Sequence, residues 1–462
     1  MQQRTVTPRF FTCSFPRCRR PSDRAGGGCN GCKRYLCFKH LSPTFRHCKQ
    51  GLELDEASWW AQIDSLVDRL RARIDDDAVC KYASSLNGGR KCSVEHSNMM
   101  GCANYHARVR FHDGSRSWLL RVPRVTDFAG GPESFVEYLV VSEYATLKFL
   151  EKTTVPAPRA FGHGLCSDGS DQGIGVSFLL IEELPGKPWL DGGIPADESN
   201  QDQKAKIWSG LADIIAELAR HPFPKAGSLC LDVASRIQVG PTASDRFVVL
   251  DPDGPFEGAV DYYTAWAEQY LALIADRQLY PEYPVDAYIV YLFLKENAWQ
   301  LAQEEGKQAP TRVEFFLKHV DDHGDHLLLD DDDNITGVID WQMARVVPRA
   351  EAFGPSLISV HLQAFFDGRV SLGAIRSWRI GTGDKDEKAR RFFWGLGLEP
   401  QWSAALPMAS AILKAFGEQR EWVEWREHAL REYRDDKRLR ALARACPRRR
   451  PRLPRRCKEV RW

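Results

Sequence analysis

The chain has 462 residues, more than a single hydrophobic core usually organises, so two or three domains are expected. Its 43% hydrophobic and 27% charged residues are ordinary values for a globular protein and exclude global disorder. The formal net charge of +1 gives the whole molecule no electrostatic reason to bind nucleic acid, and no apolar run is long enough for a membrane span or a secretory signal. We therefore expect a soluble protein of the cytoplasm.

Cysteine is concentrated near the N-terminus, where six of the 13 cysteines lie between Cys13 and Cys48, unlike a secreted disulfide scaffold. Short pairs of cysteine and histidine separated by longer loops suit tetrahedral zinc, because each pair supplies two corners of the site. This segment has too little apolar surface for a core, so the metal would supply the folding free energy. Unligated buried thiols are the alternative.

The spacing resembles that of cross-braced two-zinc fingers, in which the first and third ligand pairs share one ion and the second and fourth share the other. The resemblance implies a first structural zinc site of Cys13, Cys18, Cys37 and His40. It implies a second site of Cys29, Cys32, His47 and Cys48. The last two ligands are adjacent here, where such fingers usually separate them by one residue. A module of this kind is also a candidate surface for a protein partner.

The next elements are predicted from periodicity. Residues 54–77 place apolar side chains at helical spacing and predict an amphipathic helix. Residues 102–124 alternate apolar and polar side chains around a turn at His112–Ser115, which predicts a β-hairpin. Residues 133–152 have a helical period, and residues 176–189 contain a short buried strand that ends at Pro185-Gly186. Hairpin, helix, strand and turn in this order are typical of the small lobe of a kinase.

The remainder is predicted to be mostly helical to about residue 435, except for one patch at residues 315–345. In this patch a His-x-Asp sequence precedes two short apolar strands, LLL and VID, that flank an acidic turn. Phosphoryl transfer needs a carboxylate that orients the acceptor hydroxyl and further ligands for the magnesium that bridges the nucleotide phosphates. A loop and hairpin of this type present all of these groups within a short reach.

The sequences His319-Val320-Asp321, His326 and Ile339-Asp340-Trp341 resemble the motifs of the aminoglycoside phosphotransferases, which read H-x-D-x-x-x-x-N followed by I-D-W or I-D-F. The resemblance covers residues 80 to about 360 and points to a fungal-type branch of the family. It implies an α+β, bilobal protein-kinase-like fold, with a small β-rich N-lobe and a larger, mainly helical C-lobe behind the zinc-finger module. It also implies that Asp321 is the catalytic carboxylate and Asp340 a metal ligand.

The same resemblance assigns the nucleotide contacts. Glu182, Glu183 and Leu184 would belong to the hinge that contacts adenine, and Glu143 would hold the basic residue that contacts phosphate. That basic residue is Arg121, where the family usually has lysine, and its guanidinium is bulkier and less adaptable than an ammonium group.

Two more departures from the family pattern concern the phosphate region. His326 stands where the family has asparagine, and an imidazole there either shifts the metal preference from magnesium toward manganese or zinc or removes one ligand. The loop expected over the phosphates, GCANYHARV, contains Gly101 and no further glycine.

The predicted organisation has four parts: the zinc-finger-like module in 1–50, the N-lobe with its leading helix in 51–189, the C-lobe with the catalytic and metal motifs in 190–435, and a basic disordered tail in 436–462. After Asp436 the tail has twelve basic residues and one acidic residue, with prolines that prevent a continued helix. It could bind RNA weakly, an acidic membrane surface or a nuclear import receptor, and a solvated tail without a partner is an equal alternative.

The predicted function is ATP-dependent transfer of the γ-phosphate to a hydroxyl group of a small molecule, with magnesium or manganese at the nucleotide and zinc as a structural metal. Two alternatives stay open. One is a kinase-like protein that binds a ligand or a partner without transfer, which His326, Arg121 and the glycine-poor loop would fit. The other is an interaction adaptor in which the zinc module dominates. The sequence does not identify the acceptor.

Overall fold

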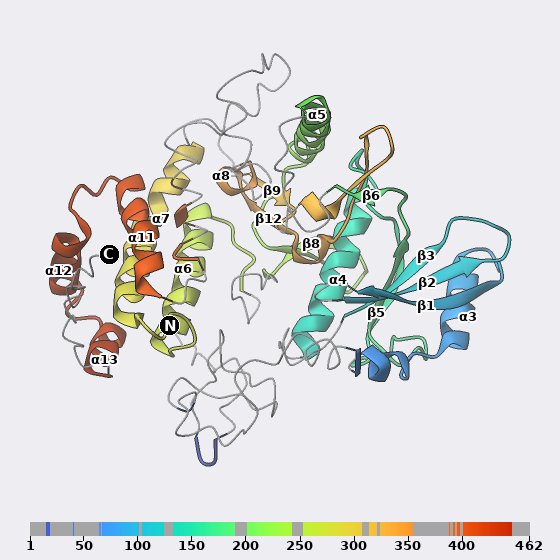
Figure 1. The fold of residues 1–462 in the computed structure, drawn as a ribbon, viewed down its shortest axis with the longest axis horizontal. Coiled ribbons are helices and arrows are strands. Elements are labelled where there is room, and N and C mark those ends of the chain that lie inside the picture. Colours follow the sequence, from blue (N-terminus) through green and yellow to red (C-terminus); the bar gives the residue numbers. More distant parts are fainter. Residues whose placement is uncertain are drawn as a thin grey trace, which may run out of the picture.

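The computed structural model describes residues 15–18, 40, 64–65, 67–100, 104–123, 133–189, 201–242, 253–306, 314–320, 324–353, 388, 391–392, 395–397 and 401–445. Within these ranges a β-rich lobe and a helical region lie at opposite ends of the molecule, with three small sheets between them (Figure 1). This arrangement confirms the predicted kinase-like fold of mixed α and β structure. No described helix is both long and apolar enough to cross a membrane.

The N-lobe is built on a five-stranded antiparallel sheet in the order β1-β2-β3-β5-β4. Its strands are β1 Cys92–Met100, β2 Asn104–Phe111, β3 Trp118–Pro123, β4 Ala160–Gly164 and β5 Phe178–Glu182. Alternate residues of β2 are buried, as the sequence pattern requires for a strand with one face on a core. The predicted hairpin is confirmed by the pairing of β2 with β3.

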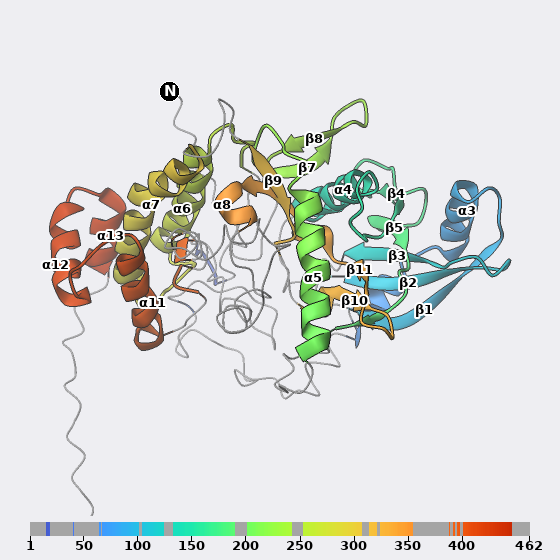
Figure 2. The same ribbon diagram turned by 90° about the horizontal axis from the view of Figure 1, so that it is seen from above.

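Two helices flank this sheet. Helix α4, Glu133–Leu150, lies between the sheet and the small hairpin of β7, Ser228–Leu231, and β8, Ile237–Gly240 (Figures 1 and 2). Helix α3, Asp76–Leu86, packs beside β1, and the carboxylate of Asp75 caps its N-terminus by accepting from the amide of Ala78. The helix in α4 and the strand β5 were predicted, whereas α3 and β1 were not.

The C-lobe is mainly helical, as predicted. Its helices are α5 Gln201–Leu218, α6 Ala259–Ala275, α7 Pro284–Gly306, α8 Arg349–Ala352, α11 Trp402–Ala415, α12 Trp422–Glu432 and α13 Lys437–Ala445. Helices α6 and α7 pack against each other and supply many buried tyrosines to the core. Figure 2 shows α5 between these helices and the N-lobe sheet.

Short strands join the two lobes. The motif patch forms a hairpin of β10, Leu327–Leu329, and β11, Ile335–Val338. The first strand is the predicted LLL, whereas the second ends at Val338, so Ile339 and Asp340 of the predicted strand VID follow it. Strand β10 also pairs with β6, Lys187–Pro188. Strand β9, Phe315–Lys318, precedes this hairpin in the chain and pairs with β12, Arg345–Pro348, which follows it. Two 3₁₀ turns complete this region: η1, Gly324–His326, and η2, Trp341–Met343. The chain between β6 and β10 therefore begins and ends at the lobe junction.

The prediction of a disordered tail is wrong for its first part. Residues Lys437–Ala445 form helix α13, in which Leu439 and Leu442 are each only 3% exposed. The prolines that were expected to break a helix all follow this segment, so they do not affect it. Residues 446–462 lie outside the described ranges, as does most of the predicted leading helix before Val67.

Candidate active site

Asp340 occupies a tight turn between β11 and η2, where its backbone has φ 66° and ψ 53°. A non-glycine residue in this left-handed region is uncommon and needs support from its surroundings. The buried indole of Trp341 donates to the carbonyl oxygen of Val338 at 2.8 Å, and Nε2 of His319 lies 2.8 Å from the carbonyl oxygen of Ile339. The two rings meet edge to face, with centroids 4.7 Å apart. The motif's aromatic side chains thus fix the turn that presents the aspartate.

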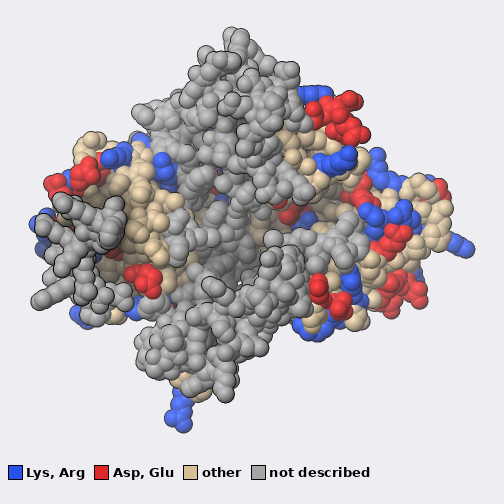
Figure 3. All heavy atoms as spheres, in the orientation of Figure 1, with Lys and Arg blue, Asp and Glu red and all other residues tan. Residues whose placement is uncertain are grey.

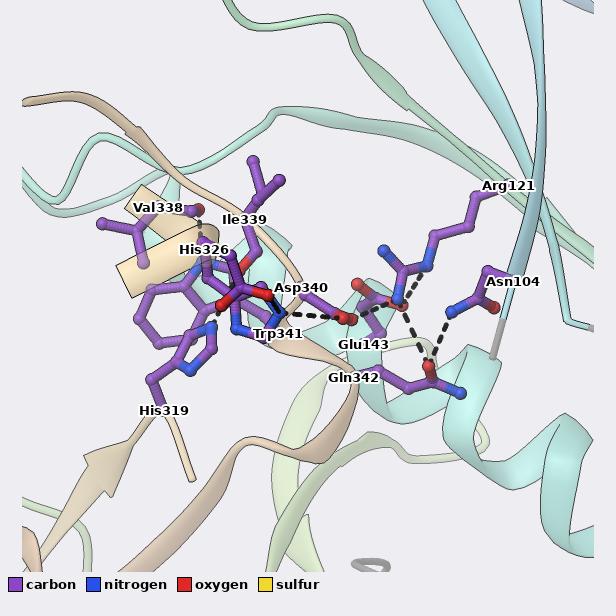
Figure 4. Close-up of polar contacts among 11 residues, drawn as sticks. Asn104, Arg121, Glu143, His319, His326, Val338, Ile339, Asp340, Trp341 and Gln342 are labelled. Atoms are coloured by element: carbon purple, nitrogen blue, oxygen red, sulfur yellow. Dashed lines mark hydrogen bonds and ion pairs between the residues drawn. The ribbon is translucent and has the colours of Figure 1, made fainter. Parts of the chain in front are cut away.

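The carboxylate of Asp340 faces two basic side chains. Its Oδ1 accepts a hydrogen bond from Nη2 of Arg121, and its Oδ2 lies 3.5 Å from Nε2 of His326 (Figure 4). Burial alone would raise the pKa of Asp340, but its electrostatic interactions with Arg121 and His326 outweigh burial and lower the pKa to about 2. The carboxylate is therefore ionised at neutral pH.

Arg121 and Glu143 form a buried ion pair between β3 and α4. Nε of Arg121 lies 3.2 Å from Oε2 of Glu143, and their side chains are 6% and 5% exposed. Burial raises the pKa of Glu143 to about 7, against the lowering effect of Arg121. For Arg121, burial favours the neutral form, but the two carboxylates of Glu143 and Asp340 raise its pKa further, so it stays charged. The structure thus brings together four residues that the sequence assigned separately.

Two neighbours of this cluster were missed by the sequence analysis. Asn104 and Gln342 are 4% and 6% exposed, and Nδ2 of Asn104 donates to Oε1 of Gln342 at 2.8 Å (Figure 4). The same oxygen accepts from Nη2 of Arg121 at 3.2 Å. Their positions in the sequence could have indicated that they lie near the site. Gln342 directly follows Trp341 of the metal motif, and Asn104 directly follows residues 101–103 of the expected phosphate loop.

The hinge glutamates pair with basic side chains of β2 and of the turn before β3. Glu182 pairs with Arg116, and Glu183 accepts from Nε of Arg108 at 2.8 Å. Figure 3 shows positive and negative side chains intermixed over the visible face of the N-lobe. Leu184 packs its side chain against the β10–β11 hairpin. Any contact of this segment with adenine would therefore use the backbone or Leu184 rather than the two carboxylates.

The donor set suits a cation that arrives with a nucleotide. Among the described residues, no group of three or more histidine, cysteine, aspartate or glutamate side chains could hold a metal ion. Magnesium commonly binds one or two carboxylates together with substrate phosphates and water. Asp340 offers one ionised carboxylate with its side chain 32% exposed, and the imidazole of His326 lies beside it. These residues fit a nucleotide-bound cation.

Several predicted site residues cannot be placed. Asp321 lies outside the described residues, although His319 and Val320, which precede it, follow β9. Of the eight predicted zinc ligands, only Cys18 and His40 are described. The ring of Phe15, which lies between Cys13 and Cys18, stacks on the imidazole of His40 with centroids 3.9 Å apart.

Comparison with known proteins gives a family match. The model of the APH phosphotransferase enzyme family matches residues 103–390. No curated protein matches the chain.

A solved Ralstonia eutropha structure, assigned to the aminoglycoside phosphotransferases, is 15% identical, with 74% of this chain and 98% of that chain covered and a TM-score of 0.44. A thermostable aminoglycoside phosphotransferase mutant with AMP-PNP and hygromycin B is 15% identical, with coverages of 80% and 98% and a TM-score of 0.36. A type I macrolide 2'-phosphotransferase is 18% identical, with coverages of 80% and 96% and a TM-score of 0.31.

Proposed function

The chain belongs to the APH phosphotransferase enzyme family, and on that premise we propose that it transfers the γ-phosphate of ATP to a hydroxyl group of a small molecule. The observation that carries the proposal is the contact of Arg121 with both Glu143 and Asp340. Arg121 and Asp340 are 219 residues apart in the chain. Their contact joins the basic residue, the helix glutamate and the metal-motif aspartate that phosphoryl transfer uses.

Each residue would have a distinct task. Arg121 would bind phosphate oxygens of the nucleotide, and Glu143 would hold its guanidinium in place. Asp340, with His326 beside it, would hold a magnesium or manganese ion. When bound, that ion would neutralise charge on the phosphate oxygens. Asp321 would orient the acceptor hydroxyl and accept its proton. The backbone at Glu182 to Leu184 would border the adenine.

Turnover tests the catalytic assignment. Purified protein with ATP and magnesium or manganese should phosphorylate some member of a library of hydroxylated small molecules, and Asp321→Ala should abolish that product. Asp332→Ala, in the exposed acidic turn, is the matched control and should keep the activity. Equal product formation by wild type and Asp321→Ala would refute the role of Asp321. Nucleotide binding without any product would favour a kinase-like protein that does not transfer phosphate.

We also propose that residues 1–50 bind structural zinc. The support is the spacing of the ligands in the sequence and the contact between Phe15 and His40. His40 is only 6% exposed. This contact brings Phe15, three residues before Cys18, beside His40, as a site that contains both Cys18 and His40 requires. Metal analysis of the full chain should find two zinc ions, and Cys18→Ser should remove one of them. A metal-free chain would refute the module.

The finer assignment is a proposal as well. We place the chain in the fungal-type branch of the family on the sequence of its catalytic loop, HVDDHGDH. We propose a cytoplasmic location, and fluorescence microscopy of a tagged full chain tests it. Nuclear signal that disappears on removal of residues 446–462 would instead assign the basic tail to nuclear import.

A further inference from the structure

A chain of buried amides connects the start of β2 to the metal motif. Asn104 is the first residue of β2, and Gln342 lies in η2, 238 residues later in the chain. Oε1 of Gln342 accepts from Nδ2 of Asn104 at 2.8 Å and from Nη2 of Arg121 at 3.2 Å. Figure 4 shows the three side chains converging from different elements. The N-lobe and the Asp340 turn are thus joined directly behind the guanidinium.

The chemistry of the groups fixes the direction of these hydrogen bonds. A guanidinium only donates, so the atom of Gln342 that faces Arg121 must be its oxygen. That oxygen in turn requires a donor from Asn104, so the amide nitrogen of Asn104 must face it. All three residues are buried, and a buried polar group without a partner is costly. The charge of Arg121 therefore sets the orientation of both amides.

The contacts also fix the orientation of the guanidinium. Nη2 of Arg121 donates to both Asp340 and Gln342, and Nε faces Glu143. Among the described residues, Nη1 donates no hydrogen bond to a protein group, and Nε lies 3.2 Å from Glu143 without a hydrogen bond to it. Because Nε is buried, Nη1 is the nitrogen of the guanidinium left for a nucleotide phosphate.

We propose that Asn104 and Gln342 are positioning residues that aim Nη1 of Arg121 at the nucleotide phosphates. They also connect the start of β2 to the turn that carries Asp340. The inference rests on the proposed function and adds two residues to it. Neither residue touches the reacting atoms; both act through Arg121.

The test compares a ligand with phosphates and one without. Asn104→Leu has a similar size and removes the donor to Oε1 of Gln342 without adding a charge, so that oxygen loses the hydrogen bond that holds it toward Arg121. Calorimetric titration should show AMP-PNP with magnesium binding about tenfold more weakly, the scale of a lost hydrogen bond to a charged group. Adenosine, which has no phosphates, should bind as it does to wild type.

Two further variants keep the result interpretable. Gln342→Met removes the acceptor without adding charge and should give the same selective loss. The double variant should lose no more than Gln342→Met alone, because both changes act through one oxygen. Arg110→Gln is the matched control: Arg110 lies on the same strand as Asn104 and forms an exposed pair with Glu95 of β1, so this variant should bind both ligands normally.

The outcomes separate the inference from the proposed function. If wild type binds AMP-PNP and the variants bind it equally well, the positioning role is refuted and the proposed function stands. If the variants lose adenosine and AMP-PNP to the same extent, with a lower unfolding temperature, the amides have only a structural role and the inference is also refuted. If wild type binds neither ligand, the proposed function fails, and this inference fails with it.

Discussion

Arg121 is a buried guanidinium that faces acceptors from three elements. Its partners are Glu143 on α4, Asp340 after β11 and Gln342 in η2. A planar guanidinium with five donors can contact acceptors from several directions in its plane. An ammonium group is a compact point charge on a flexible stem and cannot do so. The arginine therefore matches its surroundings, although the family usually has lysine at this position.

Arg121→Lys should consequently impair the protein instead of restoring a family feature. We expect magnesium AMP-PNP to bind at least about tenfold more weakly, and the free energy of unfolding to fall by about 1–3 kcal/mol, because one or two acceptors lose their charged donor. Calorimetry and urea denaturation measure the two effects. Arg110→Lys changes the same residue type at an exposed pair and should be neutral. Unchanged binding by Arg121→Lys would contradict the geometric argument.

Glu143 predicts a pH-dependent contribution to stability. Burial raises its pKa from 4.5 to about 7 in the folded chain, so its contribution is fully present below pH 4.5 and is lost as the pH rises through about 7. The contribution of Asp340 to stability has the opposite pH dependence, because folding lowers its pKa from 3.8 to about 2. That contribution changes only below about pH 4, outside the range in which Glu143 titrates. Between pH 4.5 and 7, wild-type stability should fall relative to Glu143→Gln, by up to about 1.4 kcal/mol per pH unit.

Urea denaturation of both proteins across this pH range measures that difference, and all other titrating groups cancel in it. Parallel curves would show that Glu143 titrates normally. The same ionisation should strengthen the pair with Arg121, because the carboxylate gains its charge as the pH rises.

The site could be predicted only in part from single residues. Asp340, Arg121 and Glu143 were found because each belongs to a local pattern: a short motif, a strand with one inward-facing base, and a helical period. The contact between Asn104 and Gln342 joins residues 238 positions apart, and neither has a pattern of its own. Which amides meet depends on the docking of the lobes, and a single sequence does not contain that information.

The link from β5 to β6 depends on Gly186. Its φ is +119°, and a Cβ there would lie 2.9 Å from the backbone oxygen of Leu329 and would collide with Oγ1 of Thr336. That hydroxyl already donates to the carbonyl oxygen of Pro185 at 2.6 Å. The hinge segment is thus held against the β10–β11 hairpin at a point that admits no side chain.

Gly186→Ala should therefore destabilise the lobe junction. We expect a loss of about 2–4 kcal/mol, which combines backbone strain with a clash against a main-chain atom. Adenosine should also bind more weakly, since Leu184 is two residues away. Gly114→Ala is the control: its φ of +77° is also positive, but no atom lies within 4 Å of the added Cβ. An equal effect of both changes in urea denaturation would show that strain alone matters.

The elements that were predicted have a clear hydrophobic period or turn sequence, and those that were missed do not. The hairpin of β2 and β3 and the helix α4 have clear periods and a clear turn, and both are present. Helix α3 has only two buried residues, Val79 and Ala83, so its apolar period is short. Helix α13 has a basic composition typical of a tail, and its buried leucines were overlooked. A capping signal existed, because Asp436 accepts from the amide of Leu439 at 2.7 Å.

Helix α13 closes the helical end of the C-lobe. It packs against α6 and α7, and Arg438 pairs with Glu268 of α6. In Figure 1 this end lies on the opposite side of the molecule from the N-lobe sheet. Changes in α13 should therefore lower the stability of the protein and leave nucleotide binding unchanged.

Two truncations test this separation. A chain that ends at Ala445 keeps α13 and should unfold at the wild-type temperature. A chain that ends at Asp436 loses the burial of Leu439 and Leu442, about 1.5–3 kcal/mol for each side chain, and should unfold several degrees lower. The full-length double variant Leu439→Ala and Leu442→Ala should reproduce most of that shift. Both truncated chains should bind AMP-PNP like wild type below their unfolding temperatures. Equal unfolding temperatures for the two truncations would mean that α13 does not pack on the lobe in solution.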